Sequence, residues 1–198
     1  PSSFDRSVAL NIAMNTFWES GFHNTGIAAL VEQMGIKPSS LYAAFGSKEQ
    51  LFYESLDHYA QASLRNIEKR LNKTADVEKD LLDMMRFAAS DTSQRKGCLL
   101  VNSLLELGRS DTKLSMFVTQ YLQNNEAAIQ RALQRGVDSG QFLPSMDVQA
   151  TASFLITLLW GFRVMRQTHP TPQKLDAVLQ HVSTYLRISA TEPAIPCN

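Results

Sequence analysis

The side chains best suited to bind another molecule gather in one short stretch in the first quarter of the chain. Lys37 and Lys48 supply positive charges there, and Tyr42 supplies a hydroxyl between them. Lysine and hydroxyl side chains are common partners of phosphate oxygens in protein–DNA complexes. The stretch therefore points to a phosphate-bearing partner such as DNA.

Two short helices joined by a tight turn would position these groups. Val31 and Met34 place apolar side chains at helical spacing, and Gly35 follows where a helix end favours a residue with positive φ. After the turn, Pro38 stands at the first position of the next helix, for which its fixed φ is suited. The pattern predicts a helix-turn-helix over about residues 26–45.

The second of these helices has the composition of a helix that reads DNA. Leu41 and Phe45 are four residues apart, so they share one face and are expected to pack inward. Ser39, Ser40 and Ala43 lie toward other sides. Small side chains let a recognition helix approach the major groove closely, so this helix is the predicted DNA-contacting element.

A third helix is predicted to open with a capping box, with Ser47 as the N-cap and Gln50 three residues later. Lys48 then lies in the first turn, where the helix dipole disfavours a cation. A DNA phosphate would remove the conflict by binding both the lysine and the free N–H groups. The alternative is a Lys48 side chain that points into water. Tyr42 has two interpretations as well, a phosphate contact or a core aromatic.

This stretch resembles the TetR family of one-component bacterial regulators. The resemblance rests on Gly21, Phe22, Thr25, Leu30, Gly35, Ile36, Leu41, Tyr42, Phe45, Ser47, Lys48, Glu49 and Leu51. It implies an all-α fold with an N-terminal three-helix head and a C-terminal helical body for ligand sensing and dimerisation. It also implies a homodimeric repressor that binds a palindromic double-stranded DNA operator and responds to a small-molecule inducer.

The resemblance also assigns roles to individual positions. The phosphate contacts it implies are Thr25, Tyr42 and Lys48. The groove-facing set it implies is Lys37, Pro38, Ser39 and Ala43. Three departures matter: Gly26 stands where a second Thr is usual, Lys37 replaces a small N-cap, and Ala44 replaces an aromatic or His. The operator sequence therefore does not follow from relatives.

The expected organisation is a DNA-binding domain over 1–71, a ligand-sensing and dimerisation domain over 72–188 and a mobile tail over 189–198. The helix that opens at Ser47 is expected to run to about Leu71 and to link the two domains. Breaks at Gly and Pro residues separate the later helices. These are predicted near 76–91, 97–109, 111–138, 147–167 and 172–188.

The last two helices are candidates for the dimer interface, because both carry broad apolar surfaces that would form a four-helix interface with a second copy. The first surface comprises Phe154, Leu155, Leu158, Leu159 and Phe162. The second comprises Leu175, Val178, Leu179, Val182, Tyr185 and Leu186. The alternative is that both surfaces belong to an internal core.

A sensor site is predicted around Cys98, which follows the cations Arg95 and Lys96 and is expected in the first turn of a helix. Both features lower a thiol pKa and favour a reactive thiolate, so an electrophile is one candidate inducer. The alternative for Cys98 is a small buried side chain.

A largely apolar pocket that binds a small molecule is the other candidate for the sensor site. Its expected lining is Asn102, Glu106, Phe117, Tyr121 and Trp160. For Glu106, an exposed or salt-bridged side chain is the alternative.

Charge is the main argument against DNA binding. The chain has a formal net charge of zero, and residues 1–70 are not basic either. Nucleic-acid-binding domains usually carry a basic surplus. The alternative function is accordingly a dimeric redox or ligand sensor whose helix-turn-helix head binds a protein partner.

An enzyme is not expected. The histidines show no metal-ligand spacing with one another or with the two cysteines, and no Gly-rich phosphate loop is present. No catalytic residue, metal or cofactor is therefore predicted.

The chain start lacks a signal-peptide pattern, no apolar run has the length to span a bilayer, and the cysteines lie far apart. We expect a cytoplasmic protein with no membrane partner.

Overall fold

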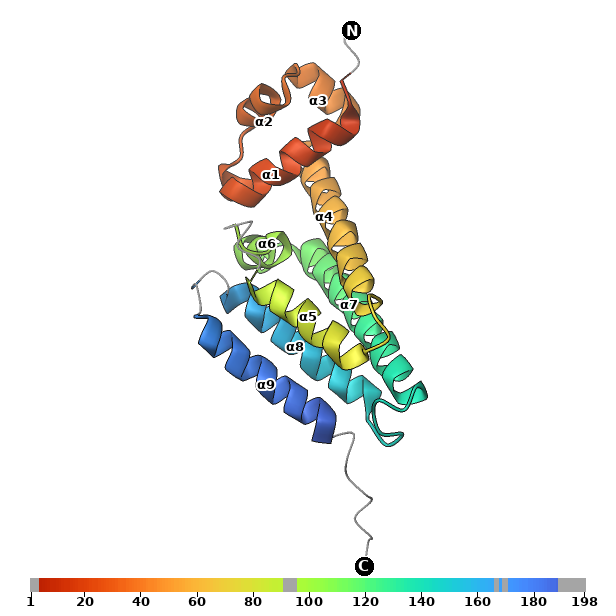
Figure 1. Cartoon of the computed structure of the whole chain (residues 1–198). Coiled ribbons are helices and arrows are strands. Elements are labelled where there is room, and N and C mark those ends of the chain that lie inside the picture. The colour runs from red at the N-terminus through yellow and green to blue at the C-terminus, as the bar shows by residue number, and fades with distance from the viewer. Residues whose placement is uncertain (1–3, 91–95, 166–167, 169–170, 189–198) are drawn as a thin grey trace, which may run out of the picture. The chain divides into compact units, whose positions relative to one another are not determined.

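The structure is a computed structural model that describes residues 4–90, 96–165, 168 and 171–188. The tail predicted over 189–198 lies outside these residues. Across the described residues the chain is helical, without strands, which confirms the all-α class. The helices are α1 (Arg6–Asn24), α2 (Ile27–Met34), α3 (Pro38–Phe45), α4 (Lys48–Leu71), α5 (Val77–Ser90), α6 (Leu99–Leu107), α7 (Thr112–Asp138), α8 (Val148–Met165) and α9 (Pro172–Ile188) (Figure 1).

The chain divides into two compact units. Unit 1 spans Pro1–Ser63 and Lys96–Thr119, and unit 2 spans Leu64–Arg95 and Gln120–Asn198. The long helices α4 and α7 each contribute to both units. The sequence analysis places a domain boundary at residue 71, whereas the compact units group α6 and the start of α7 with the N-terminal helices.

Helix α1 begins with a side-chain cap and is broken near its end. The Asp5 carboxylate accepts hydrogen bonds from the backbone N–H groups of Ser7 and Val8, at 2.8 and 3.3 Å. These bonds satisfy amides that the helix start leaves without partners. Gly21, inside the last turns of α1, has φ +77° and ψ 173°. One further turn follows it, so Gly21 forms a kink within α1.

Aromatic packing holds α1 against α4 within unit 1. The ring of Phe52 lies 5.1 Å from Phe17 and 4.9 Å from Phe22, measured between centroids. Trp18 meets Tyr59 edge to face at 4.9 Å. Offset and edge-to-face contacts in this range stabilise aromatic clusters beyond their buried area. These contacts fix the first turns of α4 relative to α1.

Unit 2 has a core of its own, built mainly from α5, α7, α8 and α9. Helix α5 packs against both α8 and α9, which are neighbouring helices in Figure 1. Leu81, Ile129 and Leu155 are fully buried in this core. A turn before α5 is closed by Asp80, whose carboxylate accepts from the backbone N–H of Thr74 at 2.8 Å and from its hydroxyl at 2.9 Å.

Helix α8 corrects the statement that no apolar run has the length to span a bilayer. Its 18 residues, with a mean hydropathy of 1.3, are long and apolar enough to cross a membrane by length and composition. A single helix of this kind is weak evidence, because core helices of globular proteins have the same length and composition. Leu155, Leu159 and Phe162 of α8 belong to the core of unit 2.

Candidate nucleic-acid interface

The turn between α2 and α3 has the predicted geometry. Gly35 adopts the left-handed conformation, with φ +65° and ψ 31°. Its backbone N–H donates to the carbonyl of Glu32 at 3.2 Å, and the N–H of Ile36 donates to the carbonyl of Val31 at 3.1 Å. A residue with a side chain would be strained in this conformation. Gly35 therefore lets α2 end at Met34 and the turn begin at the next residue.

Helix α3 separates an inner face from an outer face. Leu41 and Phe45 are 0% and 3% exposed, which confirms that this pair points inward. Tyr42 is 48% exposed, so the core-aromatic alternative for this residue is wrong. The other exposed residues at the start and along the outer face are Lys37, Pro38, Ser39 and Ala43, and Ser40 is half-buried. The predicted groove-facing residues therefore share one accessible surface.

The start of α4 is capped as predicted on one side only. The Ser47 hydroxyl accepts from the backbone N–H of Gln50 at 3.1 Å. The Gln50 side chain instead covers Gly46, where an added Cβ would lie 1.8 Å from Oε1 of Gln50. Gly46 has φ +76°, so both its conformation and this close approach favour glycine.

Lys48 has a partner that the sequence analysis does not anticipate. Its Nζ lies 4.3 Å from the centroid of the Phe22 ring. A cation over an aromatic face is attracted by the ring quadrupole. The Phe22 ring thus restrains the side chain of the half-buried Lys48, which lies in the first turn of α4.

Two further charged residues at this surface have roles that the sequence analysis does not assign. Glu49 lies at the N-terminus of α4, where hydrogen bonds from its own backbone N–H and the Ser47 hydroxyl lower the pKa of its carboxyl group. Arg6 donates from Nε and Nη2 to the carbonyl of Ala44, each at 3.4 Å, and from Nη2 to Glu54 at 2.6 Å. Arg6 thus fixes the end of α3, and no local motif marks it.

Thr25 differs from the other predicted phosphate contacts. It is 1% exposed, and its hydroxyl donates to the carbonyl of Gly21 at 2.6 Å. The residue therefore secures the segment between the kink of α1 and the start of α2. Its side chain is not on the accessible surface that Tyr42 and Lys37 share.

Glu106 of α6 is also engaged inside unit 1. Its carboxylate oxygens accept from the backbone N–H groups of Phe22 and His23, at 3.1 and 2.8 Å. These amides begin the turn that follows Gly21, so Glu106 caps that turn from another helix. An added Cβ on Gly21 would lie 2.7 Å from Oε2 of Glu106, and glycine permits the close approach. This position favours a bonded role over the predicted role as a pocket residue.

Cys98 and Asn102 also have partners within unit 1. Cys98 is the N-cap of α6, is 1% exposed, and accepts a hydrogen bond at Sγ from the Tyr59 hydroxyl at 3.6 Å. Nδ2 of Asn102 donates to the carbonyl of Lys96 at 2.7 Å, and Nε1 of Trp18 donates to the same carbonyl at 3.1 Å. The burial of Cys98 favours the packing alternative over a readily accessible thiolate.

The remaining predicted sensor residues divide between the units. Phe117 is half-buried in unit 1, whereas Tyr121 and Trp160 belong to unit 2. Nη1 of the buried Arg163 donates to the Tyr121 hydroxyl at 2.9 Å. The sequence analysis misses Arg163, because a basic residue in the last turn of a helix is usually exposed to solvent.

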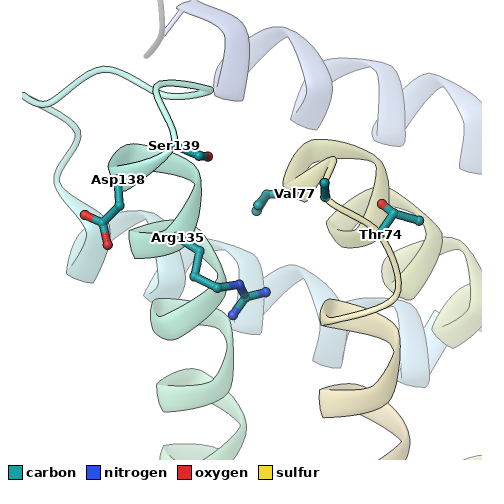
Figure 2. A pocket seen from close by; sticks show the side chains of 6 residues that line it. Thr74, Val77, Arg135, Asp138 and Ser139 are labelled. Atoms are coloured by element: carbon teal, nitrogen blue, oxygen red, sulfur yellow. The ribbon is translucent and has the colours of Figure 1, made fainter.

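Unit 2 has a surface depression of about 390 Å³. The residues that line it include Thr74, Val77, Arg135, Asp138 and Ser139, which are labelled in Figure 2. None of the predicted sensor residues lines it. Nη2 of Arg135 donates to the carbonyl of Leu71 at 2.6 Å, so this guanidinium joins α7 to the end of α4.

Sequence comparisons match both parts of the chain to one family. Residues 9–54 match the family described as bacterial regulatory proteins, tetR family, and residues 77–182 match the tetracyclin repressor-like C-terminal domain. The HTH-type transcriptional repressor ComR of Escherichia coli K12 is 30% identical over 194 residues, covering 95% of this chain and 90% of ComR. BdcR, an HTH-type transcriptional repressor of the same strain, is 30% identical over 129 residues, covering 65% of this chain and 66% of BdcR.

A solved structure shares both fold and sequence with this chain. It is a cysteine mutant of the TetR family transcriptional regulator CifR complexed with 26bp double-strand operator DNA. The TM-score is 0.76 at 30% identity, with 94% of this chain and 98% of that chain covered. Together with the helix-turn-helix geometry, these matches show that the chain belongs to the TetR family and is a DNA-binding transcriptional regulator.

Proposed function

We propose that this chain is a cytoplasmic homodimeric repressor that binds a palindromic DNA operator through α3 and releases it when a small molecule binds the helical body. The observation that carries the DNA-binding part is the surface of α3, where Lys37, Ser39 and Tyr42 are exposed while Leu41 and Phe45 are buried. The operator complex of CifR supports the same partner. The division into a DNA-binding domain over 1–71 and a sensing domain over 72–188 belongs to this proposal.

Each side chain has a distinct proposed role at the DNA. Lys37, Pro38, Ser39, Ser40 and Ala43 face the major groove, and Tyr42 donates its hydroxyl to a phosphate. Lys48 binds a phosphate at the N-terminus of α4, held by the Phe22 ring. Thr25 contributes by fixing the chain before α2, because its hydroxyl is bonded to the Gly21 carbonyl. Few cations are available, so we expect a shallow salt dependence for each subunit.

The dimer interface is proposed on α8 and α9. Most of their apolar residues are buried within unit 2, but Phe154 and Tyr185 are each 41% exposed, and their rings lie 5.1 Å apart. The neighbouring Leu158 and Val178 are half-buried. No atom lies within 4 Å of the position that an added Cβ on Gly161 would take, so another helix could approach closely there. These residues form the apolar surface that a second copy would cover.

The test of DNA binding is fluorescence anisotropy with DNA from upstream of the protein's own gene, in the presence of excess nonspecific DNA. Lys37→Ala should weaken binding by about 1–3 kcal/mol for each half-site. Lys69→Ala is the matched control, because it removes an exposed cation of α4 that is not on the α3 surface. Equal losses from both variants would indicate nonspecific attraction, and binding to a protein in place of DNA would support the alternative function.

A further inference from the structure

Two polar side chains in the core of unit 2 lack a hydrogen-bond partner among the residues that the structure describes. Asn125 of α7 is 0% exposed, and both its Oδ1 and its Nδ2 are unpartnered. Nε1 of Trp160, on α8, is buried and unpartnered as well. An unmet buried donor or acceptor costs the free energy of its lost hydration, and native proteins contain few of them.

The two groups lie on the same stretch of a helix pair. Helices α7 and α8 are joined at one level by Arg163 and Tyr121, and at another by the hydroxyl of Ser153 and the carboxylate of Glu126. These two contacts make the helices antiparallel. Asn125 lies one turn beyond Tyr121 toward Glu126, and Trp160 lies one turn before Arg163 toward Ser153. Both unpartnered groups therefore fall between the two joining contacts.

The chemistry of this region is rich in donors. An indole N–H and a guanidinium only donate hydrogen bonds, and an asparagine amide adds two donors to one acceptor. The unpartnered donors of Trp160 and Asn125 therefore favour a partner with several acceptor atoms. The guanidinium of the buried Arg163, which donates to Tyr121, adds a positive charge nearby that favours an anion. The core that Trp160 packs against is apolar and includes Leu159 and Ile129, next to Trp160 and one turn from Asn125 in sequence. A carboxylate on an apolar body satisfies both conditions.

We propose that unit 2 binds a small apolar carboxylic acid between α7 and α8, with its carboxylate accepting from Nε1 of Trp160 and Nδ2 of Asn125 beside the Arg163 guanidinium. This inference rests on the proposed ligand-responsive function and names the chemical class of the inducer. It assigns Asn125 and Arg163 to the site along with two of the predicted sensor residues, Tyr121 and Trp160.

The first test needs no ligand. If Asn125 is kept for binding, then Asn125→Leu replaces an unmet amide with an apolar group of similar size and should raise the thermal midpoint by about 2–4 °C. Asn124→Leu is the matched control, because Asn124 is the exposed neighbour on the same helix. A lower midpoint for Asn125→Leu would overturn the proposal, since the amide would then be held by a structural partner such as a water molecule.

The second test measures binding directly. The chain has two tryptophans, so Trp18→Phe leaves Trp160 as the sole fluorescent indole. The probes are straight-chain carboxylates from acetate to decanoate and phenyl carboxylates from benzoate to 4-phenylbutyrate, each paired with its primary amide. We expect at least one acid to change Trp160 fluorescence, with its amide about ten-fold weaker. Binding by no acid, or equal binding by acid and amide, would overturn the carboxylate assignment.

Variants then separate the site from the rest of the protein. Asn125→Leu should weaken binding of the best acid about ten-fold. Trp160→Phe should weaken binding by a similar factor. Because that variant lacks the fluorescent indole, its binding is measured by the rise in thermal midpoint that the acid causes. Unchanged binding in both variants would overturn the proposed contacts. Operator anisotropy without any acid tests the DNA-binding function separately. A protein that binds its operator but no acid retains the proposed repressor function and loses only this inference.

Discussion

Units 1 and 2 treat their buried polar groups differently. In unit 1, the buried hydroxyls of Thr16, Thr25 and Ser55 all donate to backbone carbonyls within their own helix turns or the adjoining loop. In the described part of unit 2, Asn125 and Trp160 carry buried polar atoms without partners. Satisfied groups rigidify a core, whereas unsatisfied ones are costly. Other buried polar groups of unit 2, such as Asp80 and Arg163, do have partners. The two unpartnered side chains therefore set one stretch of unit 2 apart, the stretch to which we assign the proposed ligand.

Leu41→Ala should have the largest effect. Leu41 is fully buried on the inner face of α3, and such a truncation costs about 2–5 kcal/mol of the free energy of unfolding. Operator affinity should fall as well, because α3 loses the contact that positions it. Urea denaturation and anisotropy measure the two effects.

The matched variant in unit 2 is Leu133→Ala, which removes an equally buried side chain from α7. It should lose a similar free energy of unfolding but keep operator affinity at a temperature where the protein is folded. Equal loss of operator affinity from both variants would break the distinction between the units.

Glu106→Ala tests the rigidity of unit 1 at the kink of α1. The change removes the acceptor of two backbone N–H groups, those of Phe22 and His23, and should cost about 1–3 kcal/mol of the free energy of unfolding. Operator affinity should drop too, because Phe22 holds Lys48. Glu106→Gln keeps one acceptor and should show a smaller loss by both measurements. A neutral result for Glu106→Ala would mean that the kink is held by other contacts.

Thr16→Val in unit 1 and Asn125→Leu in unit 2 should change the free energy of unfolding in opposite directions. The Thr16 hydroxyl shares its single proton between the Ile12 carbonyl, at 2.9 Å, and Oε1 of Gln33, at 2.6 Å, and the second contact links α1 to α2. Its loss should cost about 1–2 kcal/mol by urea denaturation. The corresponding polar-to-apolar change in unit 2, Asn125→Leu, is expected to stabilise. The same sign for both variants would contradict the contrast.

The sequence predicted the fold and the exposed face of α3 well, because both follow from short-range rules. Gly35 and Pro38 mark helix ends through their own backbone preferences, and the spacing of Leu41 and Phe45 defines an inner face. The later helices also fall within about two residues of their predicted ends, except where 76–91 and 147–167 run into residues outside the described set.

Contacts between distant segments could not be predicted in the same way. Glu106 meets the amides of Phe22 and His23 across more than eighty residues of sequence, and Arg6 meets the Ala44 carbonyl across 38. A backbone N–H or carbonyl group carries no residue-type signal, so no sequence motif predicts these bonds. Asn125 was missed for a related reason, because one asparagine among polar neighbours looks like part of a solvated helix face.

Tyr53→Phe should have the smallest effect, and its pH dependence identifies its cause. The Tyr53 hydroxyl donates to Asp111 at 2.6 Å, which lowers the pKa of Asp111 below its ordinary 3.8. Burial, followed by the bond to Asp111, raises the pKa of Tyr53 above its ordinary 10.0. The stabilisation is therefore full between these ordinary values. The stabilisation fades as pH falls below 3.8, where Asp111 of the unfolded chain binds a proton first. It also fades as pH rises above 10.0, where Tyr53 of the unfolded chain releases its proton first.

We expect Tyr53→Phe to lower the free energy of unfolding by about 1 kcal/mol at neutral pH and to flatten both limbs of the pH profile. The control in unit 2 is Tyr185→Phe, since the Tyr185 hydroxyl lies 3.5 Å from the uncharged Thr151 hydroxyl. That variant should leave the acid limb unchanged, because no carboxylate gains or loses a partner. Urea denaturation from pH 3 to 11 measures both profiles. An acid limb that Tyr53→Phe leaves as steep as before would show that Asp111 is stabilised mainly by its bond to the backbone N–H of Leu114.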